Sequence, residues 1–220
     1  MNPASLIGSV FAERLPHPRW FRQAAPASVY RLAGRMLPWL WAAAALFGAS
    51  GLVLGLVIAP ADVEQGDAYR IVFVHVPAAW MSMLIYLVMA GWAAIGLVLG
   101  TRLPSMIAGA MAPTGALMTL IALWTGSLWA KPTWNAYWTW DPRVTTATIT
   151  VLIYIAYLLF RNGIDNRSAR ARFGRIYALF AFISLLITYY STRWFRSIHP
   201  FVLNGNNPEA QGGFDIGPSM

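Results

Sequence analysis

Two histidines in apolar surroundings are the side chains of this sequence best suited to bind a metal. His75 follows a run of branched apolar residues, and His199 comes just after a long apolar stretch that ends near Tyr190. A neutral imidazole is a common ligand for zinc, copper and the iron of a porphyrin. No third ligand for zinc or copper is apparent, whereas two imidazoles alone can face each other across a porphyrin iron. The alternative for each histidine is a capping or carbonyl-bonded side chain, and His17, between prolines in a basic segment, is interpreted as incidental.

A cluster of aromatic residues is the second candidate, because four of the eleven tryptophans fall within residues 129–140. The spacing of Trp134, Tyr137 and Trp138, continued by Asp141, is i, i+3, i+4 and i+7, which predicts one face of a helical turn. Such a face is a flat, polarisable platform for a large planar ligand. A belt of aromatic residues at the membrane interface is the alternative. The candidate platform consists of Trp129, Trp134, Tyr137, Trp138, Trp140 and Asp141.

Basic residues and one acidic residue complete the candidate site. Asp141 precedes Pro142, a pair that is typical of the N-cap and first position of a helix. The cations are candidates for contacts with the carboxylates of a ligand, with lipid headgroups as the alternative. Arg196 would share a face with His199 if the preceding helix continues that far. The candidate cations are Arg70, Lys131, Arg143, Arg193 and Arg196.

Several kinds of chemistry are excluded by what the sequence lacks. It contains no cysteine, which excludes disulfides, zinc–thiolate sites, iron–sulfur clusters, thiol nucleophiles and covalent haem attachment through a C-x-x-C-H motif. No P-loop, His-Glu-x-x-His motif or catalytic triad is present. No acidic residue lies within an apolar run, so no proton relay through a bilayer is expected. We therefore expect a binding protein rather than an enzyme.

Long apolar runs must position these residues. The chain of 220 residues is 58% hydrophobic and 11% charged, with a mean hydropathy of +0.53. Soluble domains carry about 25% charged residues, and about 20 apolar residues suffice for one membrane span. The sequence therefore predicts an all-α, polytopic membrane bundle with one span in each of the ranges 36–60, 71–100, 104–129, 142–160 and 173–190.

The distribution of basic residues predicts the orientation. One side would carry 11 of the 16 lysines and arginines, and the other side would carry the remaining five. By the positive-inside rule, the N-terminus and the basic segment 1–35 lie in the cytoplasm, and His75, His199 and the aromatic cluster lie outside. The polar segment 200–220 then forms an outer tail. This distribution explains the net charge of +8, and no nucleic-acid partner is expected.

Four segments carry a resemblance to a known family. The segment 134–141 resembles the tryptophan-rich "WWD" motif of the haem-handling proteins of cytochrome c maturation. The segments 59–62, 75–79 and 126–132 resemble haem exporter protein C, the CcmC family. The resemblance extends in order from about Leu37 to His199.

The resemblance implies a function and a site. It implies that residues 36–199 form a membrane domain that holds haem b at the periplasmic face of the bacterial inner membrane, with the WWD loop near 129–141. The two outer histidines of the family match His75 and His199. The implied partners are a membrane-anchored periplasmic haem chaperone, an ABC transporter with an ATPase subunit and a second membrane subunit, a small membrane peptide, and the lipid bilayer.

Some features differ from the family pattern. The family usually has Gly at Asn135, Trp at Tyr137 and a small residue at Pro142, and it usually has a sixth span after the second histidine. Lyase-like assistance to covalent haem attachment on the chaperone remains open. Two further alternatives are a membrane electron carrier and a structural transporter subunit that binds no haem. The histidines of interest all lie on one face, which argues against the electron carrier.

Overall fold

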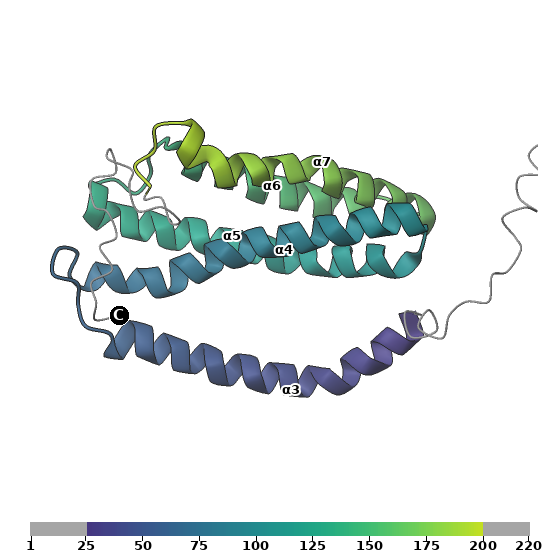
Figure 1. Ribbon diagram of the computed structural model, residues 1–220, viewed down its shortest axis with the longest axis horizontal. Coiled ribbons are helices and arrows are strands. Elements are labelled where there is room, and N and C mark those ends of the chain that lie inside the picture. The colour runs from purple at the N-terminus through teal and green to yellow at the C-terminus, as the bar shows by residue number, and fades with distance from the viewer. Residues whose placement is uncertain (1–25, 200–220) are drawn as a thin grey trace, which may run out of the picture. The chain divides into compact units, whose positions relative to one another are not determined.

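The computed structural model describes residues 26–199, and its regular elements are helices (Figure 1). They are α3 (Pro26–Val53), a π-helical turn (Leu54–Ile58), a 3-10 helix (Asp67–Ile71), α4 (Val72–Leu99), α5 (Arg102–Trp134), α6 (Pro142–Asn162) and α7 (Arg167–Trp194).

Five helical stretches are long and apolar enough to cross a membrane, which confirms the predicted all-helical membrane fold. They cover Pro26–Ile58, Asp67–Leu99, Arg102–Trp134, Pro142–Asn162 and Arg167–Trp194. In a hydrocarbon layer every backbone N–H and C=O must bond within the chain, and a continuous helix satisfies this requirement.

The helices extend further than the apolar runs from which the spans were predicted. The first begins at Pro26 rather than near Met36, α5 continues past Trp129 to Trp134, and α7 continues to Trp194. The backbone hydrogen bonds of a helix can continue beyond its apolar residues. Each of these helices is therefore extended by additional helical turns that contain polar residues. Residues 1–25 of the N-terminal segment and the whole predicted tail 200–220 lie outside the described residues.

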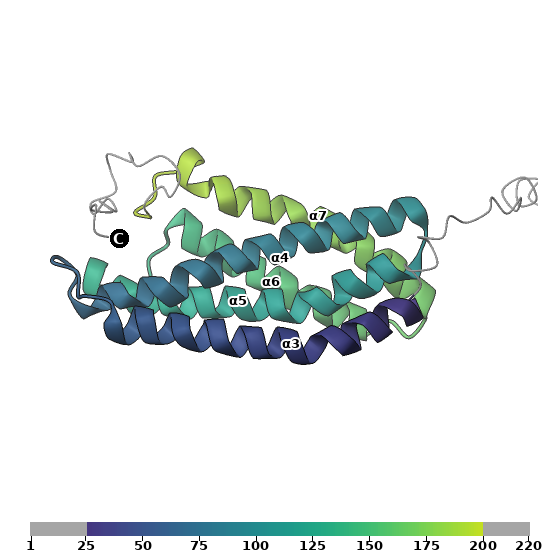
Figure 2. The ribbon, with the colours of Figure 1, turned by 60° about the horizontal axis from the view of Figure 1, so that its bottom comes forward.

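Contacts divide the chain into two units, Met1–Phe47 and Gly48–Met220. The described part of the first unit is the beginning of α3, which contains Pro38. The second unit contains α4 to α7, which run side by side in both views (Figures 1 and 2). The α4–α5 and α6–α7 connections lie at one end of this four-helix bundle, and the segments that precede α4, link α5 to α6 and follow α7 lie at the other.

Small residues on α5 allow its neighbours to approach closely. Ala108, Ala112 and Ala116 recur every fourth residue and are buried in the core against larger side chains of α4 and α6. Small residues at such spacing are common where membrane helices pack, because close backbones gain van der Waals contact. The buried Tyr154 of α6 lies against Gly115 of α5, and its hydroxyl donates to a carbonyl of α4. The core therefore fixes α4, α5 and α6 relative to one another.

Candidate functional site

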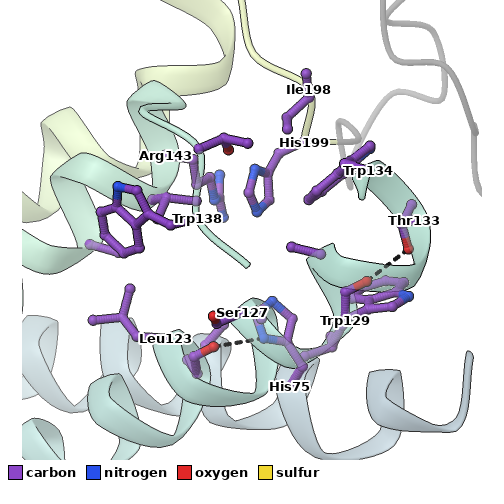
Figure 3. A pocket seen from close by; sticks show the side chains of 18 of the residues that line it. His75, Leu123, Ser127, Trp129, Thr133, Trp134, Trp138, Arg143, Ile198 and His199 are labelled. Carbon is purple, nitrogen blue, oxygen red and sulfur yellow. Dashed lines mark hydrogen bonds between the residues drawn. The ribbon is translucent and has the colours of Figure 1, made fainter. Parts of the chain in front are cut away.

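A large cavity opens at the end of the bundle where α4 begins, α5 ends and α6 begins (Figure 3). The space between its walls and in its open mouth together is ≈ 1330 Å³, a figure that includes solvent outside the walls. Side chains from α4, α5, α6 and the segment after α7 line it.

His75 lines one side of the cavity, and its hydrogen bonds define its protonation. Its Nδ1 lies 2.9 Å from the carbonyl oxygen of Ala122 and 3.2 Å from Oγ1 of Thr125. A carbonyl can only accept, so Nδ1 carries the hydrogen and donates it. In the neutral ring Nε2 then keeps a lone pair, which is the arrangement that a metal ligand requires.

Gly126 makes room for the imidazole of His75. A Cβ atom at Gly126 would lie 2.8 Å from Cε1 of His75, closer than real contacts allow. The indole of Trp129, one helical turn further along α5, meets the imidazole edge to face, with 5.8 Å between ring centroids. Helix α5 therefore supplies the hydrogen-bond acceptor, the space and one aromatic wall for His75.

His199 lines the opposite side of the cavity (Figure 3). Its Nδ1 lies 3.1 Å from Oδ1 of Asp141, and its ring is 5.5 Å from that of Trp134. An ionised carboxylate accepts only, so Nδ1 of His199 also carries a hydrogen, and in the neutral ring Nε2 keeps its lone pair. The two histidines therefore share one tautomer, although their acceptors differ.

Asp141 connects three parts of the site while lying buried beneath it. Its Oδ1 accepts from the backbone N–H of Arg143 at 2.9 Å, which confirms the predicted N-cap of α6. Its Oδ2 accepts from the backbone N–H of Ile198 at 2.8 Å. Burial alone would raise the pKa of Asp141, but the hydrogen bond and attraction from His199, with hydrogen bonds from Ser197 and Ile198, lower the pKa to about 2. Asp141 does not line the cavity; it holds His199 there.

The aromatic residues do not form the helical face that their spacing predicted. Helix α5 ends at Trp134, Asn135 has a left-handed backbone with φ = 56°, and residues 136–141 are not helical. The segment instead returns toward α5, where Oγ of Ser127 donates to the carbonyl of Tyr137 at 2.7 Å.

Four of the five predicted platform rings nevertheless line the cavity, namely those of Trp129, Trp134, Tyr137 and Trp138. The fifth, Trp140, is not among the lining residues and is 82% exposed. It meets Trp138 edge to face, with 5.7 Å between ring centroids. Helix α5 therefore supplies two of these rings and the irregular segment after it supplies the other two, whereas Trp140 lies outside the cavity lining.

Of the five candidate cations, Arg143 lines the cavity (Figure 3). Arg70 pairs with Asp67 at 3.3 Å and donates to the carbonyl of Leu56. Lys131 donates to the backbone and side-chain oxygens of Asn135.

The two remaining cations lie near the end of α7. Arg193 lies 6.0 Å from the ring centroid of Tyr190. Arg196 is exposed. The shared helical face with His199 was expected only if the helix continued that far, and α7 ends at Trp194.

Gln65 is a cavity residue that the sequence analysis missed. Its Oε1 accepts from Nε1 of Trp129 at 2.7 Å. A turn presents it, in which Oδ1 of Asp62 accepts from the backbone N–H of Gln65 at 2.7 Å and Gly66 has φ = 58°. The Asp and Gly types indicate a turn, but nothing in the sequence indicates that this turn reaches Trp129.

The fold and the site define a multi-pass helical membrane protein with a cavity that has aromatic walls and two flanking imidazoles. The family model of "Heme exporter protein C" matches residues 19–204. The chain is 39% identical over 176 residues to "Heme exporter protein C" of Escherichia coli (strain K12), covering 80% of this chain and 72% of that protein. It is 39% identical over 174 residues to the protein of that name from Bradyrhizobium diazoefficiens, covering 79% of this chain and 66% of that protein. For the Paracoccus denitrificans protein the identity is 37% over 175 residues, covering 79% of this chain and 72% of that protein.

The chain therefore belongs to the heme exporter protein C family, whose members handle haem in cytochrome c maturation. The resemblance stated from the motifs is confirmed.

Proposed function

We propose that this protein binds haem b non-covalently in the cavity and delivers it to a membrane-anchored haem chaperone. One observation carries the proposal: His75 and His199 lie on opposite sides of one cavity, each with Nδ1–H bonded to an oxygen and Nε2 left to bind iron (Figure 3). Metal-binding histidines usually donate their second N–H in this way, since the bond orients the ring and raises its basicity.

The lining of the cavity fits a porphyrin. The rings of Trp129, Trp134, Tyr137 and Trp138 offer apolar, polarisable surface for a large aromatic macrocycle. Arg143, which lines the cavity between these walls, is our first candidate for a propionate contact, because a guanidinium binds carboxylates with two parallel hydrogen bonds. Arg70, Lys131, Arg193 and Arg196 remain candidates for a propionate that extends beyond the cavity.

The two proposed ligands differ in how firmly the fold holds them. His75 is part of α4, whereas His199 follows the end of α7 and is held through Asp141. We propose that haem leaves by loss of the His199 bond, after which the chaperone's own histidine takes that iron position. The partial opening of the cavity to solvent gives the chaperone access.

The proposed location is the bacterial inner membrane, with the cavity facing the periplasm. The excess of basic residues on the opposite side supports this orientation. The proposed partners besides the chaperone are the ABC transporter's ATPase and membrane subunits and a small membrane peptide of the same system.

The test is the absorption spectrum of protein purified in mild detergent from haem-replete cells. We expect a Soret band in the parent that shifts or disappears in His75→Ala and in His199→Ala but not in His17→Ala. A colourless parent would favour a structural subunit, and a band indifferent to both substitutions would refute the ligand assignment. Reversible reduction by a quinol without transfer to the chaperone would favour an electron carrier.

A further inference from the structure

Arginines gather at the end of the four-helix bundle opposite the cavity, where α4 meets α5 and α6 meets α7 (Figure 1). Within the described residues the carboxylate at this end is Asp165, and none of these arginines forms an ion pair with it. Within residues 26–199, the positive charge of this end is therefore largely unneutralised by carboxylates. The arginines are Arg102, Arg161, Arg167, Arg170, Arg172 and Arg175.

Arg161, in the last turn of α6, is held among three helices. Its Nη1 donates to the carbonyl of Ser105 at 3.2 Å and to the hydroxyl of Tyr157 at 2.9 Å. Gly109 of α5 provides the space, because a Cβ atom there would overlap the guanidinium. A Cβ atom at Gly174 of α7 would lie 3.6 Å from the stem of Arg161. The guanidinium is thus fixed by carbonyl and hydroxyl oxygens rather than by a carboxylate.

Arg175, on α7, is held in the same manner. Its Nε donates to the carbonyl of Ala171 at 3.0 Å, and its Nη1 donates to the carbonyl of Gly96. A Cβ atom at Gly96 would lie 2.8 Å from Cδ of Arg175. The hydroxyl of Ser105, whose carbonyl binds Arg161, donates to the same Ala171 carbonyl at 3.4 Å. Both guanidinium groups therefore belong to one hydrogen-bonded network.

We propose that Arg161 and Arg175 form a preorganised binding site for the phosphate of an anionic phospholipid. Each guanidinium has five N–H donors and uses two bonds to hold its position, which leaves donors for a phosphate. Fixed guanidinium forks bind phosphate with two parallel hydrogen bonds. Because this site lies at the ends of helices that can span a membrane, the phosphate of a lipid headgroup reaches it where a leaflet surface meets the bundle.

The experiment measures thermal unfolding of the purified full chain in micelles that contain either phosphatidylglycerol or phosphatidylcholine. We expect phosphatidylglycerol to raise the Tm of the parent. In Arg161→Gln and in Arg175→Gln we expect this increase in Tm to be mostly lost. Arg172→Gln is the matched control, since it removes the same charge from an exposed position at the same end, and we expect it to respond like the parent.

Each of the following outcomes would overturn the proposal. An equal loss in Arg172→Gln would show general attraction to the basic end, and an equal response to phosphatidylcholine would show no requirement for a negative headgroup. Stabilisation of the parent by inorganic phosphate equal to that by the lipid would assign the site to soluble anions. If either glutamine variant fails to fold, Arg161→Lys and Arg175→Lys keep the charge but remove the planar fork; an unchanged response in both would count against the site.

Discussion

The two proposed iron ligands differ in the group that accepts from Nδ1. Ala122 offers a carbonyl to His75, whereas Asp141 offers an ionised carboxylate to His199. A carboxylate orients the ring and raises its basicity more strongly than a neutral acceptor does. The same carboxylate caps α6, so the start of that helix and the position of His199 depend on one side chain.

Asp141→Asn separates these two roles. Asn is as good an N-cap as Asp, so we expect α6 to persist, while His199 loses its charged acceptor. We expect haem affinity to fall about 10-fold to 100-fold, as for other substitutions of groups that support metal ligands. A haem titration measures the affinity, and circular dichroism serves as the control for helix content. Unchanged affinity would show that Asp141 does not support a ligand.

The lowered pKa of Asp141 predicts a pH dependence of stability. Its value in the folded protein is about 2, against 3.8 for the ordinary group, so folding favours the ionised form. The contribution of Asp141 is therefore fully present above 3.8 and is lost as the pH falls through about 2. We expect the difference in Tm between the parent and Asp141→Asn to be largest near neutral pH and to shrink as the pH falls from 3.8 through about 2. A difference that stays constant with pH would contradict the prediction.

Gly126 gives a second test at the residue scale. In Gly126→Ala the added methyl would meet Cε1 of His75, so we expect the imidazole to shift and the Soret band to weaken or move. Gly91→Ala is the matched control, because a Cβ atom there meets nothing within 4 Å. A normal spectrum for Gly126→Ala would mean that His75 tolerates displacement or does not bind iron.

At the scale of elements, α5 supports both the core and the site. Ala108, Ala112 and Ala116 allow the approach of α4 and α6, and the same helix then supplies Ala122 and Trp129 to the cavity. Close packing fixes the depth and rotation of α5 against α4. The contacts of His75 with α5 therefore depend on packing further down the bundle.

Gly115→Ala tests this packing. The added methyl would overlap the hydroxyl of Tyr154, and overpacking of a core costs about 1–3 kcal/mol. We expect a lower Tm than for the parent or Gly91→Ala. A Tm equal to that of Gly91→Ala would show that α6 moves away from α5 without cost.

For the whole molecule the central question is which end of the bundle faces outward. The absence of cysteine makes single-cysteine labelling direct. We expect a membrane-impermeant maleimide to label Val63→Cys in intact spheroplasts and Asp165→Cys only after permeabilisation, since both positions are exposed at opposite ends of the bundle. The reverse pattern would place the cavity in the cytoplasm and refute the proposed delivery.

The sequence by itself determined the helical membrane fold and the N-cap at Asp141, and it identified His75 and His199 as candidate ligands. A long apolar run in a bilayer must pair its own backbone N–H and C=O groups, and a continuous helix does this. An Asp-Pro pair before such a run is a local signal for the start of a helix. These inferences depend on neighbouring residues, so they needed no knowledge of the distant chain. The family motifs additionally predicted haem as the ligand.

Only the tertiary structure decided how the candidates are arranged. The left-handed residue Asn135 ends α5, so the spacing of the aromatic residues did not give a helical face, and Trp140 lies outside the cavity lining. The bond between His199 and Asp141 joins residues 58 positions apart, and the bond between Trp129 and Gln65 joins residues 64 apart. Such contacts depend on how helices pack against one another, which periodicity and residue type along one segment do not encode.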